Sequence, residues 1–261
     1  MASTLLIFFI TLIFYSNGRE KGRRVDTFAH IGYSYCIRYL VPIIQALLSL
    51  GLALCEMSTH IIIILLLIIS IYWFCFQRMY QERVKIQLYY ECLCPDCREF
   101  DTTQLKETVL ALGSHLDINL YPYGNAQTKE NNGHVEFICQ HGPSECYGNK
   151  LHACAIDYLK NITTAVLYNS CMMEGSGKGS DDAAADMCGH SMGINSEPIK
   201  QCANGAKGTA LLKYYGVESK KANFNYVPYI LINGVENSGK NFKQDVCKAF
   251  KTPPPACNGL L

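Results

Sequence analysis

The chain has 261 residues, enough for one domain of ordinary size and an accessory segment. Its 23 basic and 22 acidic residues nearly balance, which excludes the bulk basicity of a nucleic-acid-binding protein, so we expect no nucleic-acid partner. Only 17% of the residues are charged, a low fraction for a soluble protein, and the deficit falls mostly in the first 80 residues.

Residues 1–82 form an apolar leader with three hydrophobic runs, at 4–15, 39–55 and 61–76. Small residues follow the first run, as they do at the cleavage site of a signal peptide. The second run is interrupted by a proline and a glutamine, and the third is short for a comfortable membrane span.

A second sequence that looks like a signal peptide begins at Met57 and ends just before the soluble domain. Two interpretations stay open: a leader associated with a membrane through residues 39–76, or an upstream extension before a secretory signal. The basic residues after the third run favour the second interpretation, because the positive-inside rule would otherwise place the cysteine-rich domain in the cytosol. These residues are Arg78, Arg83 and Lys85.

The soluble domain, residues 83–261, opens with strict alternation of apolar and polar residues over 84–91, which predicts a strand. Cys94-Pro95-Asp96-Cys97 follows at once, and then a helical stretch that ends at Gly113. Alternation resumes at Leu116, Ile118 and Leu120. The order strand, cysteine turn, helix, strand is that of a βαβ unit.

The middle region, from about residue 123 to residue 225, has helical rather than strand-like patterns, and its clearest helices are predicted at 153–168 and 196–215. Residues 175–180 have the composition of a flexible loop.

A β-branched run at 226–232 predicts a further strand, and Asn233-Gly234 has the residues of a type I′ hairpin turn. A last helix is predicted at about 241–250. The first half of the domain is thus strand, cysteine turn, helix and strand, and the second half is strand, turn, strand and helix. These two halves around a helical, disulfide-rich insertion predict an α/β protein with a thioredoxin-like fold. Pro228, after Val227, stands where that fold places a cis-proline beside the cysteine pair, so we expect these two residues to contact the substrate.

Cys94 and Cys97 are the predicted catalytic pair. A CxxC at the start of a helix places the first sulfur near unpaired backbone N–H groups and the positive end of the helix dipole, which favour the nucleophilic thiolate. Cys94 is then the attacking residue and Cys97 the resolving one. Asp96 opposes this effect, because a nearby carboxylate disfavours a second negative charge.

The same cysteines have two other interpretations: a structural pair, or a metal clip that includes Cys92. A zinc site usually needs a second cysteine pair at loop spacing, and the sequence has no second CxxC. The redox interpretation is therefore preferred, with no metal and no cofactor expected.

Eleven of the fourteen cysteines lie between Cys92 and Cys257. Without the predicted catalytic pair, nine of these cysteines remain. We expect eight of them to form four disulfides, in one of 105 possible pairings. Cys92 is then an odd thiol, which is either free or a modulator of the pair. The eight are Cys139, Cys146, Cys154, Cys171, Cys188, Cys202, Cys247 and Cys257.

Such a disulfide framework persists only where cellular reductants do not keep thiols reduced, so we expect a location in the secretory pathway. The sequon Asn161-Ile162-Thr163 fits the same compartment and makes Asn161 the predicted glycosylation site.

A second motif runs from Cys139-Gln140-His141-Gly142 through Glu145-Cys146 and Asn149 to Cys154. Taken alone, His141 and Glu145 are candidates for a base pair or for metal ligands, although a structural turn held by a disulfide is the preferred interpretation. The whole arrangement resembles the gamma-interferon-inducible lysosomal thiol reductase (GILT) family. Its signature of CQHG, two residues, EC, two residues, N, four residues, C is matched at every fixed position.

The resemblance covers about residues 85–257 and implies that the family's active-site CxxC corresponds to Cys94 and Cys97. It implies reduction of protein disulfides in an acidic lysosomal or endosomal compartment, or after secretion. The expected partners are disulfide-containing protein substrates and a small-thiol reductant. Two alternatives remain: an oxidase or isomerase on the same fold, and a non-catalytic binding protein held together by disulfides.

Overall fold

The computed structural model describes residues 59–79, 83–175 and 179–260. The chain divides into two units, Met1–Gln81 and Glu82–Leu261. In the first unit the described element is the helix α4 (Thr59–Met79). None of the described helices combines the length and the hydropathy that crossing a bilayer requires.

Several sequence predictions fall partly or wholly outside the described residues. These are the signal peptide at 4–15, the beginning of the second signal at Met57, the membrane segment at 39–76 as far as residue 58, and the centre of the loop at 175–180.

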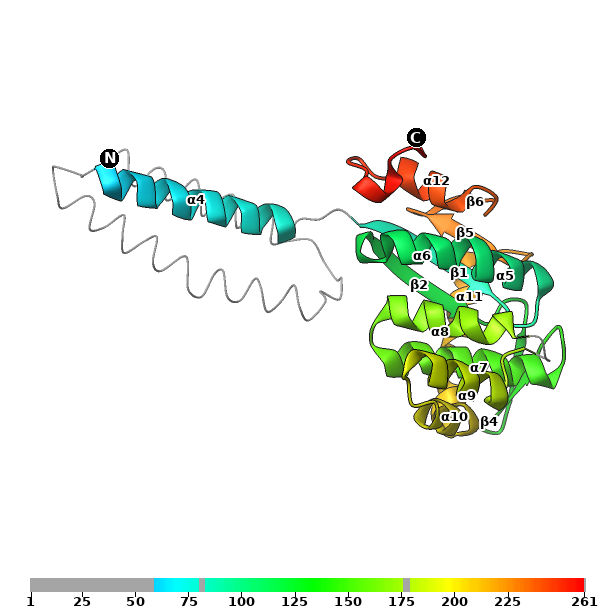
Figure 1. The fold of residues 1–261 in the computed structure, drawn as a ribbon. Helices are drawn as coiled ribbons and strands as arrows, with labels where there is room; N and C mark the ends of the chain where they lie inside the picture. The colour runs from blue at the N-terminus through cyan, green and yellow to red at the C-terminus, as the bar shows by residue number, and fades with distance from the viewer. Residues whose placement is uncertain (1–58, 80–82, 176–178, 261) are drawn as a thin grey trace. The chain divides into compact units, whose positions relative to one another are not determined.

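The second unit is built on a four-stranded sheet in the order β2-β1-β5-β6 (Figure 1). The central strand β1 (Val84–Tyr90) pairs in parallel with β2 (Leu116–Pro122) and antiparallel with β5 (Tyr229–Ile232). The last strand, β6 (Val235–Asn237), forms a hairpin with β5. A parallel pair joined by a helix and followed by a hairpin is the sheet of a thioredoxin-like fold, as the sequence predicted.

One face of the sheet is covered by the helices that follow the cysteine turn. These are α5 (Pro95–Phe100), a π-helical turn (Asp101–Leu105) and α6 (Lys106–Leu112), which a 3₁₀ turn at residues 113–115 ends. The fully buried residues of β1 pack against this segment, because strand alternation directs every second side chain to the same face.

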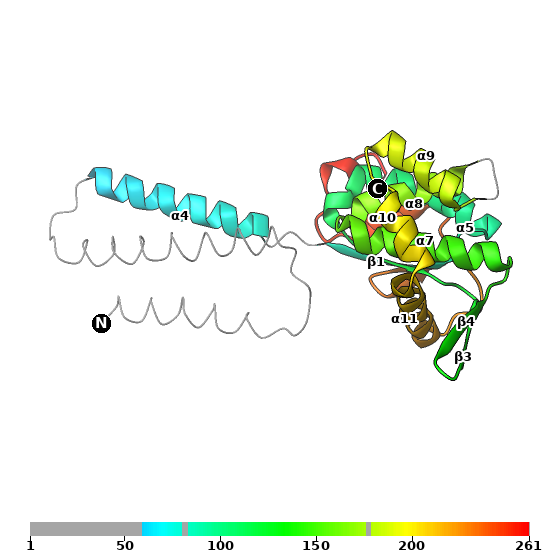
Figure 2. The ribbon, with the colours of Figure 1, turned by 90° about the horizontal axis from the view of Figure 1, so that it is seen from below.

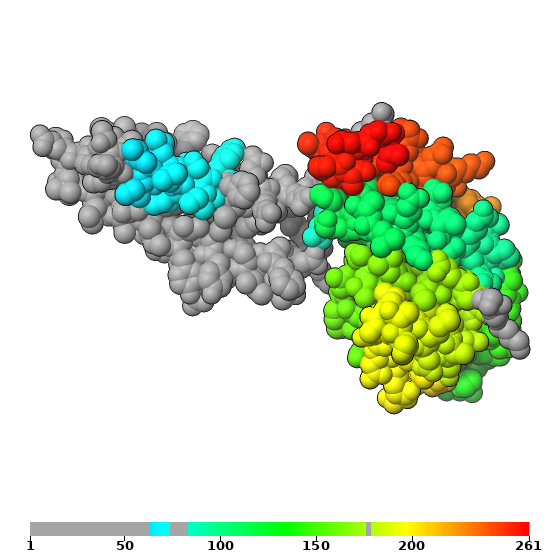
Figure 3. All heavy atoms as spheres, in the orientation of Figure 1, coloured from blue at the N-terminus to red at the C-terminus, as the bar shows by residue number. Residues whose placement is uncertain are grey.

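The helix α12 (Phe242–Lys248) completes this core, and a 3₁₀ turn at Pro255–Cys257 follows it. In the space-filling view the red C-terminal residues lie against the green α5–α6 segment (Figure 3). The ring of Phe242 meets that of Phe100 edge to face, with 5.0 Å between their centroids.

The described residues of the insertion between β2 and β5 form five helices, and four of them surround a second core. The fifth, α11 (Ala206–Ala222), lies on the opposite side of the sheet from α5 (Figure 2). The other four are α7 (Pro143–Leu159), α8 (Ile162–Glu174), α9 (Asp182–Met192) and α10 (Glu197–Asn204).

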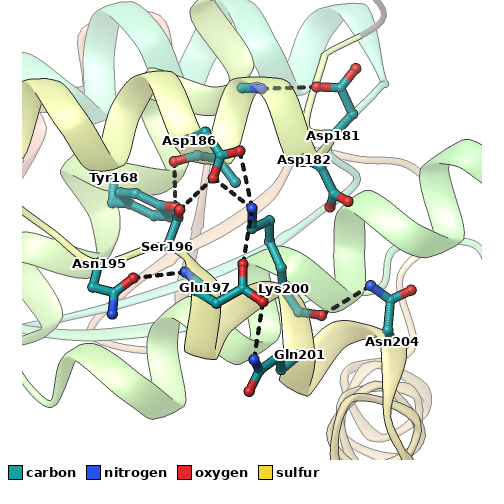
Figure 4. Close-up of polar contacts among 12 residues, drawn as sticks. Tyr168, Asp181, Asp182, Asp186, Asn195, Ser196, Glu197, Lys200, Gln201 and Asn204 are labelled. Atoms are coloured by element: carbon teal, nitrogen blue, oxygen red, sulfur yellow. Dashed lines mark hydrogen bonds and ion pairs between the residues drawn. The ribbon is translucent and has the colours of Figure 1, made fainter.

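Helices α9 and α10 are joined by a polar cluster at the surface (Figure 4). Lys200 Nζ lies 2.8 Å from Asp186 Oδ1 and 3.2 Å from Glu197 Oε2, and Ser196 Oγ donates a 2.5 Å hydrogen bond to Asp186. Exposed ion pairs of this kind contribute little to stability, so the apolar core and the disulfides carry most of the packing here.

The sequence predicted two long helices in the middle region. Both predictions are wrong for the same reason, because the structure has two separate helices in place of each one. The first breaks at Lys160, whose φ of 56° is left-handed, and Asn161 caps α8 by accepting a 3.1 Å hydrogen bond from Thr164 N. The second breaks at Gly205, which is extended between α10 and α11. A capping side chain and a glycine both compete with helix continuation.

The expectation of an all-helical middle region is also wrong, since β3 (Gln127–Asn131) and β4 (His134–Ile138) form a separate hairpin. Asn132 and Gly133 both have positive φ at its turn. The Asn-Gly pair was the available signal, but the flanking residues are mostly polar and exposed, so they lack the apolar alternation of a core strand.

Candidate active site

Cys94 lies at the N-cap of α5 with Pro95 in the first turn, and its carbonyl accepts a 3.0 Å hydrogen bond from Arg98 N. Both sulfurs are largely covered, because Cys94 is 8% exposed and Cys97 only 1%. The Val227–Pro228 peptide bond is cis, and the Val227 carbonyl oxygen lies 4.0 Å from Cys94 Sγ. The fold therefore brings together the four residues that the sequence proposed for catalysis and substrate contact.

The two thiols of the pair differ strongly in acidity. A hydrogen bond from the Cys97 thiol lowers the pKa of Cys94 to about 6. The backbone N–H groups of Cys97 and Asp96 also lower this pKa, whereas burial raises it. The carboxylate of Asp96 opposes them, but its side chain is exposed. Burial raises the pKa of Cys97 far above its ordinary value. Near neutral pH the site therefore holds one thiolate and one thiol.

Cys92 is a packing residue in this structure. It is fully buried, its thiol donates to the Glu145 carbonyl at 3.6 Å, and its backbone N–H donates to Asn149 Oδ1 at 3.0 Å. Burial raises the pKa of Cys92 far above its ordinary value, so its thiol is not a nucleophile at physiological pH.

The turn that begins the second motif is closed by the disulfide Cys139–Cys146 and leads into α7. Glu145, in the first turn of that helix, reaches back to His141. One carboxylate oxygen accepts the His141 backbone N–H at 3.0 Å, and the other lies 2.5 Å from His141 Nδ1. Glu145 is fully buried, whereas the His141 side chain is one-third exposed.

Glu91 joins this cluster from the end of β1 and was not anticipated from the sequence. Its side chain is fully buried, and Oε1 accepts a 2.6 Å hydrogen bond from Asn125 N. Oε2 has no hydrogen-bond partner but lies 3.6 Å from His141 Nδ1. Burial raises the pKa of Glu91 to about 7. The available signal was a glutamate directly before a cysteine turn, which strand alternation alone interprets as a solvent-facing residue.

Among the described residues, Glu91, His141 and Glu145 offer donor atoms within 4.8 Å of one another, close enough to consider a metal ion. Two ligands of one zinc ion, each about 2.1 Å from it, lie roughly 3.4 Å apart in tetrahedral geometry. The 2.5 Å between His141 Nδ1 and Glu145 Oε2 is instead a hydrogen-bond distance, and Glu145's other oxygen is also occupied. The contacts are those of a hydrogen-bonded cluster.

The eight cysteines proposed for disulfides form four bridges, and the other three cysteines of residues 83–260, Cys92, Cys94 and Cys97, are free. Apart from the bridge in the motif turn, they connect α7 to α10, α8 to α9, and α12 to the C-terminal turn. These bridges are Cys154–Cys202, Cys171–Cys188 and Cys247–Cys257. Asn161 is exposed at the start of α8, far along the chain from the cysteine pair.

A CxxC with one acidic and one buried thiol, on this sheet, is the construction of a thiol–disulfide oxidoreductase. The family model described as "Gamma interferon inducible lysosomal thiol reductase (GILT)" matches residues 85–192. Curated relatives match about two thirds of the chain at 30–35% identity, and the chain belongs to this family, as the resemblance in its sequence indicated.

Two relatives represent the match. The "Gamma-interferon-inducible lysosomal thiol reductase" of Carassius auratus is 35% identical over 191 residues, covering 67% of this chain and 72% of that protein. "GILT-like protein 1" of Drosophila melanogaster is 33% identical over 198 residues, covering 67% and 79%.

Among solved structures, a thioredoxin-like oxidoreductase from Silicibacter pomeroyi matches 65% of this chain and 85% of its own, with a TM-score of 0.45 and 14% identity. The oxidoreductase DsbA from Xylella fastidiosa matches 64% and 83%, with a TM-score of 0.43 and 13% identity. The fold assignment rests on the strand order and pairing given above.

Proposed function

We propose that Cys94 and Cys97 are the redox pair of an enzyme that reduces disulfides in proteins. The observation that carries this proposal is the asymmetry of the two thiols: the pKa of Cys94 is lowered to about 6 while burial keeps Cys97 protonated. A nucleophile and a protected resolving thiol are the two components that a dithiol reductase needs.

The reaction proceeds in two exchanges. The Cys94 thiolate attacks one sulfur of the substrate disulfide, which forms a mixed disulfide and releases the other substrate sulfur as a thiolate that takes a proton from solvent. Cys97 then loses its proton and attacks Cys94 Sγ, which forms the Cys94–Cys97 disulfide and releases the second substrate thiol. The substrate gains two electrons and the enzyme dithiol loses them, and a small thiol restores the dithiol.

The substrate's place is beside Val227 and Pro228. The Val227 carbonyl oxygen already lies 4.0 Å from Cys94 Sγ, so an extended peptide along this backbone brings its disulfide to the exposed side of the attacking sulfur.

Trapping tests the assignment. The Cys97→Ser variant of the full chain is expected to accumulate a mixed disulfide with an insulin-type protein substrate whose disulfides are intact, visible as a mass shift under non-reducing conditions. The Cys94→Ser variant is expected to form none and to lose turnover. Absence of turnover in the wild type, with no loss of function in Cys94→Ser, would refute the proposal in favour of a non-catalytic binding protein.

The rival direction of reaction has one observation in its favour. A stabilised Cys94 thiolate stabilises the dithiol state, and an oxidase benefits from such stabilisation. Redox titration of the pair against glutathione separates the two: a potential well below that of the glutathione pool supports a reductase, and one well above it supports an oxidase or isomerase.

We further propose that residues 83–261 are the catalytic domain and residues 1–82 a leader of the secretory pathway. The four disulfides support an oxidising compartment, and the relatives named lysosomal support an acidic endosomal or lysosomal destination. N-terminal sequencing of the mature protein tests this: a start near residue 80 supports a cleaved signal, and a retained segment 39–76 supports membrane association.

A further inference from the structure

Three aromatic residues flank the cis peptide bond between Val227 and Pro228 in the sequence, and their rings contact one another. We call Phe224, Tyr226 and Tyr229 the aromatic shelf. The ring of Tyr229 stacks on that of Phe224, with 5.3 Å between the centroids and 22° between the ring planes. Tyr226 meets Tyr229 edge to face, at 5.8 Å and 84°. The redox chemistry of the cysteine pair uses none of these rings.

The inner side of the aromatic shelf is held by the sheet. Tyr89 is paired with Tyr229 in the register of β1 and β5. Its ring lies 6.0 Å from that of Tyr229 and 5.2 Å from that of Phe224. Tyr89 is 4% exposed, so packing of this face of the sheet explains its ring. The shelf therefore rests on a fixed base.

Tyr226 is the outer ring of the shelf, and packing within the fold leaves it 45% exposed. Its hydroxyl donates a hydrogen bond to Glu236 Oε1, which raises the pKa of Tyr226 to about 12 and keeps the hydroxyl protonated at physiological pH. Tyr229 holds the ring and Glu236 holds the hydroxyl, so the side chain has one defined orientation. A large ring fixed in this way loses little conformational entropy when another apolar group packs on it.

The shelf continues the surface on which the proposed substrate lies. The Val227 carbonyl oxygen is 4.0 Å from Cys94 Sγ, and Tyr226 directly precedes Val227 in the chain. In an extended peptide, the residues one and two positions from the substrate cysteine lie about 3 to 7 Å from it along the strand. Neighbouring Cα atoms of the enzyme are about 3.8 Å apart, so Tyr226 is within reach of these residues.

Resting on the proposed function, we infer that the aromatic shelf selects substrates by binding one aromatic or large aliphatic side chain within two positions of the cysteine that Cys94 attacks. Tyr226 is the specificity-determining residue, and Glu236 positions its ring. Side chains of this kind are mostly buried in folded proteins, so the shelf directs the enzyme to disulfides in unfolded or extended polypeptides.

The test compares peptide disulfides that differ at one position. Each substrate is a symmetric dimer of the peptide Gly-Ser-X-Cys-Ser-Gly joined through its cysteine, with phenylalanine, leucine or serine at X. Further sets place X one position after the cysteine or two positions away on either side. The reduced full chain is mixed with each peptide, the reaction is quenched with acid, and the released peptide thiol is measured by mass spectrometry.

At low peptide concentration the phenylalanine and leucine peptides are expected to react about tenfold faster than the serine peptide in at least one set, the effect of burying one such side chain against a ring. The difference should appear in the half-saturating concentration, with the limiting rate unchanged, because the shelf binds the substrate away from the reacting sulfurs.

Tyr226→Ala is expected to reduce this preference to less than about twofold, by slowing the phenylalanine and leucine peptides. The preference is a ratio between two peptides on the same protein, so a smaller fraction of folded enzyme does not imitate its loss. Tyr226→Phe keeps the ring and should retain most of the preference. Tyr158→Ala removes a tyrosine of similar exposure, 43%, from α7 and is the matched control that should follow the wild type.

Equal half-saturating concentrations for the three peptides of every set overturn the inference, and so does a preference that survives Tyr226→Ala. A loss in Tyr226→Phe as complete as in Tyr226→Ala also overturns it, because the hydroxyl and not the ring would then bind the substrate. The proposed function fails separately: if the wild type reduces none of the peptides and Cys97→Ser traps no mixed disulfide, the redox assignment is wrong and the inference falls with it.

Discussion

Asn149 Oδ1 accepts a 3.0 Å hydrogen bond from the backbone N–H of Cys92, 57 residues away in the sequence. This contact fixes the turn before the redox pair to helix α7, which carries the signature. The motif and the CxxC are therefore parts of one site, because Cys92, two positions before the nucleophile Cys94, is held by Asn149 of the motif.

The acidity of Cys94 predicts its reactivity in acid. With a pKa of about 6, roughly a tenth of Cys94 is thiolate at pH 5, about 300-fold more than for a thiol with the ordinary pKa of about 8.5. Alkylation of the reduced protein by iodoacetamide, followed by mass spectrometry, should therefore titrate with a midpoint near pH 6. A midpoint at or above pH 8 would contradict acid activity, and Cys92 should remain unmodified.

Replacement of Asp96 should increase the acidity further. The Asp96 carboxylate raises the pKa of Cys94, so Asp96→Asn is expected to move the alkylation midpoint down, by roughly half a pH unit for a charge exposed to solvent. Glu99→Gln removes the same charge from an exposed position of the same helix and should leave the midpoint unchanged. An upward shift in Asp96→Asn would show that this carboxylate does not act on Cys94 as described.

Gly148 is predicted to tolerate no side chain. A Cβ there would lie 2.5 Å from Cys92 Sγ and 2.7 Å from the Ser180 carbonyl oxygen. Gly148→Ala should therefore lower the free energy of unfolding by about 1–3 kcal/mol, measured by denaturant titration. Adding Cys92→Ala should recover part of that loss.

The control for this substitution is Gly175→Ala, where a Cβ meets nothing nearer than 3.7 Å. It should change the free energy of unfolding by less than about 0.5 kcal/mol. Equal stability of the two variants would show that the contact between α7 and Cys92 is not tightly packed.

Stability should depend on pH through Asp101. This residue is buried, with Ser170 donating to Oδ1 and no hydrogen bond at Oδ2. Burial raises its pKa from 3.8 to about 7, so the folded state holds a proton that the unfolded state has lost between those values. Its contribution is complete below pH 3.8 and is lost as pH rises through 7, by at most ~4 kcal/mol.

Asp101→Asn should therefore flatten the decline in stability between pH 5 and pH 8, measured by thermal unfolding. Glu91, whose pKa is also raised to about 7, adds to the decline in the same direction. His152 opposes it below pH 6.5, because burial lowers its pKa to about 3 and its contribution is lost as pH falls.

Asp117→Asn, at a half-buried position of β2, controls for the loss of one charge. An unaltered pH profile in Asp101→Asn would exclude this residue as the cause.

Asn161 combines a predicted glycan with a helix cap, and two variants separate the roles. Asn161→Asp keeps an oxygen that accepts from Thr164 N but removes the sequon, so the endoglycosidase-sensitive mass should disappear with little loss of stability. Asn161→Ala should lose the glycan and also about 1 kcal/mol of stability in the deglycosylated protein. Wild-type protein from a eukaryotic secretory host that shows no endoglycosidase shift would rule out glycosylation at this position.

The amino-acid sequence by itself determined the parts of the protein that depend on local pattern. Strand alternation at residues 84–91, the following CxxC and the helix after it are all short-range features, so they predicted the βαβ unit, the thioredoxin-like fold and the class of enzyme. The motif from Cys139 to Cys154 predicted the family in the same way, because its spacing is a property of the chain alone.

Only the tertiary structure decided the features that depend on which distant segments meet. Strand alternation assigns Glu91 to solvent, but in the structure it is fully buried in contact with Asn125 N and His141. The choice among 105 disulfide pairings, and the burial that leaves Cys92 unreactive, likewise follow from contacts between residues far apart in the sequence. Burial and electrostatic environment are properties of the assembled fold. They lower the pKa of one free thiol and raise the pKa of the other two.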